Sequence, residues 1–518
     1  MALLRAMAGI VAGALVLGVA ELVAVFSGAG SAPAYALGAT VVDHTPDGVR
    51  EWAISTFGTN DKAVLFVCMG IVAVVVAGVA GVLERAGRPI GSVAFAVLGV
   101  IAAVIGAGRV GGFSGALPAL IGTAAGILVL RGLTGRIDDA SASPRSAPDT
   151  AVPPQKTEAT IAGAGRRRVL GGIAATGVLA LGAGLAGRLL GGARRDVTAE
   201  RATVELPRAA TPLPPLPPDA DLRVPGLTSY ITPNSDFYRI DTALIVPQVS
   251  TDSWSLRIHG MVEQEITLTW DDLLRRAPVE SLVTLACVSN PINGDLIGNA
   301  RWLGYRLDEL LAAARPLPDA DMVLSHSEDG WTAGTPLSVL TDGRDALLAI
   351  GMNGEPLPIQ HGYPARLVVP GLYGYVSATK WVTELEVTRF DKATAYWTRR
   401  GWSAQGPIKT GTRIDTPRGR GRIPQGRTVI AGVAWAQHRG VTGVEVQIDD
   451  GDWRPARLST EVTVDTWRQW TYDWEATPGQ HTLRARTTDT TGAPQTAVEQ
   501  DVIPDGATGY PTLTVQVS

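Results

Sequence analysis

The chain has 518 residues, of which 46% are hydrophobic and only 18% are charged, and its mean hydropathy is +0.15. This balance is too apolar for a purely soluble protein, and the length allows more than one domain. The formal net charge of −4 gives no general affinity for nucleic acid. Two cysteines, Cys68 and Cys287, provide no disulfide framework, so core packing has to stabilise the fold.

Residues 1–132 contain four apolar segments: Ala6–Val25, Ala63–Val82, Gly91–Ala107 and Phe113–Leu130. Each is close to the ~20 residues that a bilayer-spanning helix needs, and their Gly and Ala content suits close helix packing in lipid. Arginines mark alternate ends as cytoplasmic, namely Arg5, Arg85, Arg88, Arg131 and Arg136. We therefore expect four transmembrane helices rather than a buried helical domain. No His lies in these segments, so no haem is predicted.

The next segments connect this membrane part to the rest of the chain. Residues 133–165 are polar and rich in Pro, Ser and Ala, which predicts a flexible cytoplasmic linker. Residues 166–192 begin with Arg166-Arg167-Arg168 and continue as a Gly/Ala/Leu run. This pattern resembles a twin-arginine export signal, and it also fits the basic flank of a fifth membrane helix. Both interpretations place the C-terminal remainder of the chain on the extracytoplasmic side of the membrane. Residues 193–223 are a proline-rich linker, expected to be an extended spacer.

The most informative residue is Cys287. It ends a predicted buried strand, Val283–Val288, and precedes a polar turn, Asn290–Asp295. A thiolate in that place is a soft ligand suited to a redox metal. The alternative is that Cys287 is simply a small buried hydrophobic residue.

The surrounding motif favours the metal ligand. Cys287 is followed by Asn299-Ala300-Arg301-Trp302, by Gly304 and by a helix at Leu307–Leu311. This stretch resembles the molybdenum-cofactor domain of the sulfite oxidase family, and the resemblance extends from about Pro225 to near the C-terminus. It implies a molybdenum–molybdopterin cofactor for which Cys287 is the protein's single metal ligand. It also implies two-electron oxo transfer on a small-molecule substrate, with an electron-transfer partner that is unknown.

The same resemblance implies the cofactor-binding residues. In the family the counterparts of His361, Arg366 and Lys380 hold the pyranopterin and its phosphate, which fits an anionic group held by a planar donor fork and a point charge. Further contacts with the cofactor are implied for six residues: Asn234, Tyr238, Arg239, Asp241, Asp329 and Ser377. Turn and cap chemistry is the alternative explanation for Asn234, Asp241 and Asp329.

Two positions depart from the sulfite oxidase pattern in the expected catalytic site. The substrate-pocket Arg is displaced to Arg239, and Trp402 stands in the region of an active-site Tyr. No counterpart of a third, C-terminal substrate Arg is found. We therefore expect a less charged S- or N-containing substrate. The alternatives are a sulfite oxidase proper and a cofactor-free envelope binding protein.

The soluble part is expected to have two domains. Residues 224–404 alternate apolar runs, turns and short helices, which predicts a mixed α+β oxidoreductase domain. Residues 405–518 show short strands with period-two patterning, which predicts an immunoglobulin-like β-sandwich. The resemblance implies that this last domain forms a homodimer. The expected protein is thus a multi-pass cell membrane protein with an extracytoplasmic catalytic domain and no nucleic-acid partner.

Overall fold

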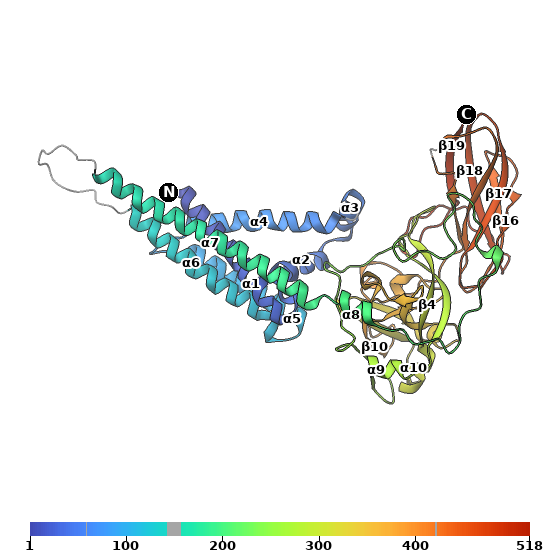
Figure 1. Ribbon diagram of the computed structural model, residues 1–518, viewed down its shortest axis with the longest axis horizontal. Coiled ribbons are helices and arrows are strands. Elements are labelled where there is room, and N and C mark those ends of the chain that lie inside the picture. The colour runs from blue at the N-terminus through green and yellow to red at the C-terminus, as the bar shows by residue number, and fades with distance from the viewer. Residues whose placement is uncertain (58–59, 142–156, 420–421) are drawn as a thin grey trace, which may run out of the picture. The chain divides into compact units, whose positions relative to one another are not determined.

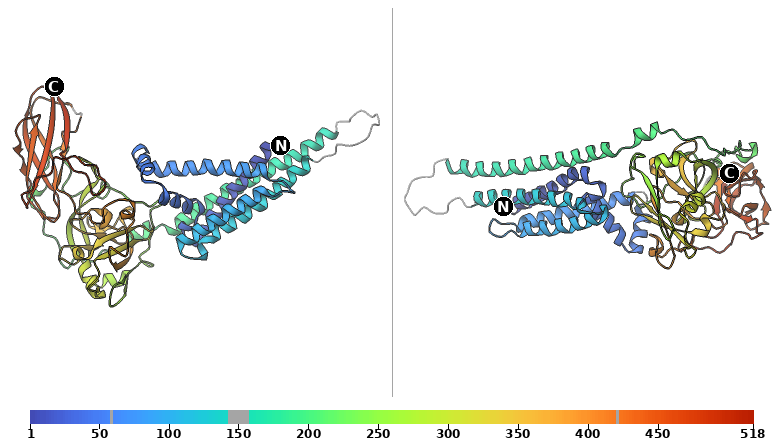
Figure 2. Two further views of the ribbon diagram at one scale, coloured as in Figure 1. Left: turned by 180° about the vertical axis from the view of Figure 1, so that it is seen from behind. Right: turned by 90° about the horizontal axis from the view of Figure 1, so that it is seen from below.

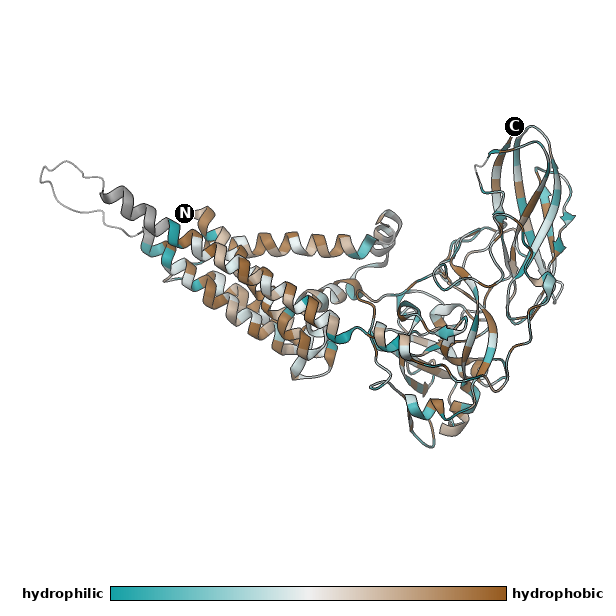
Figure 3. Ribbon diagram, viewed as in Figure 1, coloured by the Kyte–Doolittle hydropathy of each residue, from teal (hydrophilic) through white to brown (hydrophobic). Residues whose placement is uncertain are grey.

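A computed structural model describes residues 1–57, 60–141, 157–419 and 422–518, which divide into two compact units, Met1–Asp196 and Val197–Ser518. The first unit is helical (Figure 1). Its α-helices are α1 (Ala2–Ser27), α2 (Pro33–His44), α3 (Asp47–Phe57), α4 (Asp61–Leu83), α5 (Ile90–Val110), α6 (Leu117–Ser141) and α7 (Thr157–Arg195). Among the described residues, five helical stretches are long and apolar enough to cross a membrane, and they overlap α1, α4, α5, α6 and α7. Figure 3 shows apolar residues along these helices.

Helix α1 is the centre of this unit. It packs against α4, α6 and α7, and both views of Figure 2 show α1 beside α6 and α7. Small residues permit the close approach, as the sequence predicted. A Cβ added to Gly9 would lie 2.1 Å from the carbonyl oxygen of Ala77, so the backbones of α1 and α4 touch at this point.

The charged helix ends gather at one end of the helical unit. Arg5 forms an ion pair with Asp138, and the backbone N–H of Ala86 donates to the Asp138 carboxylate at 3.0 Å. Near these residues, Val169 of α7 packs with Ala8 of α1 and with α6. The start of α1, the α4–α5 turn, the end of α6 and the start of the apolar part of α7 therefore lie together.

The connection between α6 and α7 differs from expectation. Helix α6 continues to Ser141 and α7 begins at Thr157, so the expected linker 133–165 is helical at both ends, and residues 142–156 lie outside the described part of the chain. Packing of Ile137 and Val169 on α1 explains the extended helices. The region between α1 and α4 contains the short helices α2 and α3.

The proline-rich segment, expected to be an extended spacer, is hydrogen-bonded to the rest of the second unit. After α8 (Thr198–Thr203), the backbone N–H of Ala210 donates to the Pro278 carbonyl at 2.8 Å, and that of Leu213 donates to the Glu280 carboxylate at 3.0 Å. The segment is thus tied to the second unit along its length. Its prolines suit an extended strand-like path that needs few donors of its own.

The second unit begins with two sheets that share one hydrophobic core. The first has the order β2-β1-β10-β5-β6 and the second the order β3-β4-β7-β8, with β9 paired to β7. Their strands are β1 (Ser255–Gly260), β2 (Ile266–Thr269), β3 (Val279–Ala286), β4 (Ile297–Arg306), β5 (Met322–Ser327), β6 (Thr332–Pro336), β7 (Leu347–Met352), β8 (Glu355–Pro356), β9 (Arg366–Val368) and β10 (Val382–Thr388). The accompanying helices are α9 (Trp270–Leu274), α10 (Leu307–Ala314) and α11 (Leu337–Leu340). This part has the expected mixed α and β composition.

The C-terminal part consists of two further sheets. Their orders are β11-β13-β17-β16 and β12-β19-β18-β14-β15. The strands are β11 (Gly411–Thr416), β12 (Arg422–Ile423), β13 (Gly426–Trp435), β14 (Val441–Ile448), β15 (Arg454–Pro455), β16 (Arg457–Leu458), β17 (Arg468–Ala476), β18 (Gly479–Asp489) and β19 (Thr512–Val517). Side chains of both sheets, such as Ile430, Trp470 and Leu483, form one shared core. We call residues 405–518 the C-terminal module.

Candidate active site

A single pocket gathers most of the sequence-predicted site residues. It encloses about 870 Å³ of empty space, part of it open to solvent. Its walls come from the loops that follow β3, β5, β8, β9 and β10, together with residues 237–242. The predicted residues that line it are Tyr238, Asp241, Cys287, Asp329, His361, Arg366, Lys380 and Trp402. Loops carried on rigid strands are a usual place for catalytic groups.

Cys287 lies directly after β3, at the pocket wall, with only 9% of its surface exposed. The N–H of Cys287 donates to the Leu296 carbonyl at 2.9 Å, which fixes the backbone where the strand ends. Burial raises the pKa of the Cys287 thiol, although hydrogen bonds from the backbone and hydroxyl of Ser289 favour the thiolate. A metal ion would overcome the cost of burial, because a coordinating thiol loses its proton outright.

Arg366 opens β9 and is buried, with 5% of its surface exposed. Its guanidinium donates to the carbonyls of His361 at 3.1 Å and Ala378 at 3.3 Å, and it lies 5.2 Å from the ring centre of Trp302. No carboxylate among the described residues forms an ion pair with it. Burial lowers the pKa of Arg366 to about 10. A buried cation without an anionic partner is costly, so the site is suited to an anion from outside the chain.

Lys380 is a second cation in the pocket, and its side chain is 11% exposed. Its ammonium donates to the Asp241 carboxylate at 2.9 Å, and the same carboxylate accepts from Arg239 at 2.8 Å. Burial lowers the pKa of Lys380 to about 8, while Asp241 opposes that shift. Asp241 thereby holds both cations. Arg239 itself is exposed and does not line the pocket, so its link to the site is the ion pair with Asp241.

His361 is neutral near pH 7 in this environment. Burial lowers its pKa to about 4, and the positive charges of Arg366 and Lys380 act in the same direction. Its Nε2 lies 3.3 Å from the Asn234 carbonyl, and its ring packs edge-on against Phe237 at 5.7 Å. A neutral imidazole can donate one hydrogen bond and accept another, which suits contact with a polar heterocycle.

The remaining wall of the pocket is aromatic. The rings of Trp397 and Trp402 are 6.2 Å apart, and those of Trp402 and Tyr375 are 5.9 Å apart. Trp331 and the carboxylate-bearing Asp329 line the same pocket. The hydroxyl of Tyr375 donates to the Ser403 carbonyl at 2.8 Å, and burial raises its pKa. A tyrosine is therefore present in the pocket, although at a different place in the chain from Trp402.

Besides Arg239, two further predicted contacts lie outside the pocket lining. Asn234 braces its loop: its amide nitrogen donates to the Glu355 carboxylate at 2.5 Å, and its amide oxygen accepts from Asn353 at 2.8 Å. Ser377 is buried, and its hydroxyl donates to the Tyr373 carbonyl at 2.9 Å. In the structure both side chains form hydrogen bonds that stabilise the loops around the pocket.

Several lining residues were not identified from the sequence. They are Phe237, Ile240, Thr242, Val288, Ser289, Ser327, Trp331, Gly374, Tyr375, Ala378, Trp381 and Trp397. Trp331 and Trp397 lie close in sequence to the predicted residues Asp329 and Trp402, and a large aromatic ring after a turn was the available signal. The others are apolar or small residues that look like ordinary core or turn positions.

Known oxidoreductases resemble this chain in sequence. Residues 243–397 match the family model described as "Oxidoreductase molybdopterin binding domain". Human mitochondrial sulfite oxidase is 30% identical over 302 residues, which is 49% of this chain and 55% of the human protein. An uncharacterized oxidoreductase of Bacillus subtilis (strain 168), YuiH, is 32% identical over 153 residues, or 30% of this chain and 74% of YuiH. The chain spans about half the length of the sulfite oxidases that it matches.

A solved structure has a similar fold. The sulfane dehydrogenase SoxCD from Paracoccus pantotrophus aligns with a TM-score of 0.50 and 24% sequence identity. The alignment covers 56% of this chain and 82% of the SoxCD chain. At this identity the likeness concerns the fold.

Proposed function

Because the chain belongs to the sulfite oxidase family of molybdopterin-dependent oxidoreductases, we propose that the pocket at Cys287 holds a molybdenum–molybdopterin cofactor. The observation that carries this proposal is that one pocket contains both a buried thiol and Arg366. Arg366 is a buried cation that has no carboxylate partner among the described residues. The donor set fits the group, because a thiolate suits a soft redox metal and an arginine fork suits phosphate.

Each residue then has a defined task. The Cys287 sulfur is the protein ligand to the metal, and Arg366 and Lys380 donate to the anionic part of the cofactor. His361 offers a neutral ring for one donated and one accepted hydrogen bond. When bound, the cofactor supplies a metal that exchanges two electrons and an oxygen atom. The aromatic wall excludes water from the substrate and gives it an apolar surface.

We propose that the substrate is a small, weakly charged S- or N-oxide, or its reduced counterpart. In the direction of reduction the sulfur–oxygen or nitrogen–oxygen bond breaks, the substrate gains an electron pair from a separate electron-transfer partner, and the oxygen leaves with two protons as water. The relatives' names point to sulfite instead. A doubly charged oxyanion, however, needs convergent cations. Here Asp241 pairs with Lys380 and Arg239, and Trp397 and Trp402 line the same pocket.

Steady-state assays of molybdenum-loaded protein test this substrate class. With sulfite as electron donor we expect kcat/KM below the ~10⁴–10⁸ M⁻¹ s⁻¹ range of enzymes acting on their own substrates. A neutral organic S- or N-oxide, assayed with a reduced dye as the electron source, should give the higher value. A sulfite kcat/KM within that range would instead identify a sulfite oxidase proper.

We further propose that the first unit anchors the protein in the cell membrane and that Val197–Ser518 faces the extracytoplasmic side. Arg5, the turn after α4 and Asp138 meet at one end of the helical unit, which supports a cytoplasmic assignment for that end. Arg167 and Arg168 are exposed near it, whereas the Arg166 side chain lies outside the described residues.

Reporter fusions test the topology. An alkaline phosphatase fused after Ser518 should be active, because that enzyme requires the oxidising side of the membrane. Replacing Arg167 with Lys should reduce export if the twin-arginine route is used, and Arg195→Lys is the matched control at the other end of α7. Activity of a cytoplasmic reporter at Ser518 would contradict the orientation, and unimpaired export of the Arg167→Lys chain would contradict the export signal.

A further inference from the structure

The loop that follows Cys287 is short and strongly constrained. The N–H of Leu296 donates to the Asn290 side chain at 2.9 Å, and the N–H of Asn290 donates to the Cys287 carbonyl at 3.1 Å. A Cβ added to Gly294 would lie 2.4 Å from the Asn290 amide oxygen and 2.6 Å from Cδ of the Pro291 ring, so a larger residue would disturb this turn. These contacts hold the loop in one conformation. Contacts made by its outer side therefore also constrain Cys287.

The outer side of this loop is held by β11 of the C-terminal module. The N–H of Ile414 donates to the Asn293 amide oxygen at 2.8 Å, and the Asn293 amide nitrogen faces the Ile414 carbonyl at 3.5 Å. Beside this pair, the Arg413 guanidinium donates to the Gly294 carbonyl at 3.2 Å. Arg413 is buried and is itself oriented by Asp415 at 2.5 Å. Asn293 has a φ of 61°, which is a loop conformation. Its side-chain amide contacts the backbone of Ile414 in β11, where a neighbouring strand would otherwise pair.

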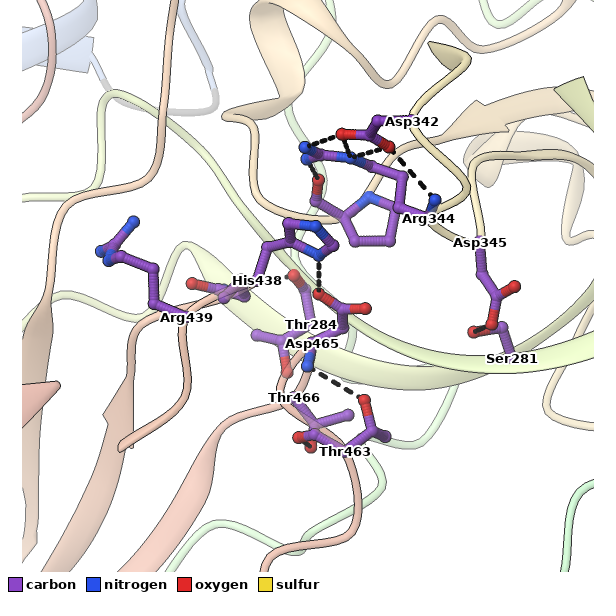
Figure 4. A network of polar contacts seen from close by, with 12 residues as sticks. Ser281, Thr284, Asp342, Arg344, Asp345, His438, Arg439, Thr463, Asp465 and Thr466 are labelled. Atoms are coloured by element: carbon purple, nitrogen blue, oxygen red, sulfur yellow. Dashed lines mark hydrogen bonds and ion pairs between the residues drawn. The ribbon is translucent and has the colours of Figure 1, made fainter. Parts of the chain in front are cut away.

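The strand that leads to Cys287 is held by the same module. Thr284, fully buried on β3, donates its N–H to the Asp465 carbonyl at 3.0 Å, and its hydroxyl accepts from the Trp467 N–H at 2.8 Å. Its carbonyl accepts from the Gln437 side chain at 3.2 Å. Figure 4 shows Thr284 beside Asp465, whose carboxylate in turn meets His438 at 3.1 Å. The edge of β3 is thus paired just before Cys287.

We propose that the C-terminal module sets the orientation of the Cys287 sulfur, with Asn293 and Arg413 as its positioning residues. The module grips the chain on both sides of the thiol, at Thr284 and at Asn293. This inference rests on the proposed function, since the sulfur needs a fixed direction only if it binds the metal. Residues that orient a metal ligand commonly change activity by ~10–100-fold when removed.

The experiment compares full-length, molybdenum-loaded variants in detergent. Asn293→Gly keeps the positive φ and removes both contacts with Ile414, whereas Asn293→Asp keeps an oxygen that accepts from the Ile414 N–H. We expect Asn293→Gly to lower kcat per molybdenum by about tenfold or more, with KM little changed, and Asn293→Asp to recover most of it. We also expect Asn293→Gly to alter the electron paramagnetic resonance spectrum of the molybdenum, because that spectrum depends on the direction of the sulfur orbitals.

The matched control is Asp449→Gly, in the same module. Asp449 also has a positive φ, of 56°, and its carboxylate accepts two hydrogen bonds, from the Thr482 N–H and from His481 Nδ1, both at 2.9 Å. This variant should leave kcat and the spectrum unchanged. A wild-type spectrum and wild-type kcat per molybdenum in Asn293→Gly would overturn the inference alone. If Asn293→Gly does not fold, Arg413→Lys is read in the same way. If the purified wild-type protein is found to contain no molybdenum, the proposed function is contradicted as well.

Discussion

Cys287→Ser is expected to abolish turnover while leaving the pterin bound. The change removes a soft thiolate and leaves a hard hydroxyl that does not ionise near neutral pH. Loss of groups that merely orient a metal ligand costs ~10–100-fold, so loss of the ligand should lower kcat by at least about a hundredfold. Arg366, Lys380 and His361 are untouched, so the anionic part of the cofactor retains its donors. Steady-state kinetics of the purified protein measure kcat. Molybdenum analysis and pterin fluorescence measure the bound cofactor.

Cys68→Ser is the matched control, since Cys68 is exposed on α4 in the other unit. It should leave kcat, molybdenum content and pterin content unchanged. Full activity of Cys287→Ser would show that the sulfur is not the metal ligand. Loss of pterin together with molybdenum would show that Cys287, rather than the buried cations, anchors the cofactor.

Local patterns predicted the elements that carry the site. Cys287 was expected at the end of a buried strand, and it follows β3 directly. A helix was expected at Leu307–Leu311, and α10 spans Leu307–Ala314, with Leu307, Leu310, Leu311 and Ala314 buried. The long apolar helices were predicted for the same reason, because their signal lies in neighbouring residues.

Long-range contacts could not be predicted from such patterns. Asn293 has the sequence context of an ordinary turn residue, and its partner Ile414 is 121 positions away. Asn234 was assigned to the cofactor, yet its side chain contacts Asn353 and Glu355, which come from the β7–β8 turn and β8. Tyr375 lies after β9 and meets Trp402 only through folding. The immunoglobulin-like assignment of the C-terminal module and its homodimer stay predictions.

Arg366→Ala is expected to empty the pocket of its cofactor. The Arg366 guanidinium is buried, held by the carbonyls of His361 and Ala378, and placed over Trp302. Each hydrogen bond from a charged group contributes about 1.5–3 kcal/mol, so two lost bonds to an anion correspond to at least about a hundredfold loss of affinity. Arg366→Lys should retain part of the cofactor, because the charge remains while the planar fork is lost. Molybdenum and pterin per chain, measured after purification, give the result.

Arg468→Lys separates this effect from the cost of disturbing any buried arginine. Arg468 also donates to backbone carbonyls, those of Ser459 at 3.1 Å and Val441 at 2.8 Å, and burial likewise lowers its pKa, but it lies in the C-terminal module away from the pocket lining. Its replacement should lower the melting temperature and leave the cofactor content intact. Because Arg366 has no carboxylate partner among the described residues, its removal relieves an uncompensated charge in the cofactor-free chain. The Arg366→Ala chain should therefore be at least as stable as cofactor-free wild type, and a large fall in its melting temperature would assign Arg366 to the fold rather than to an anion.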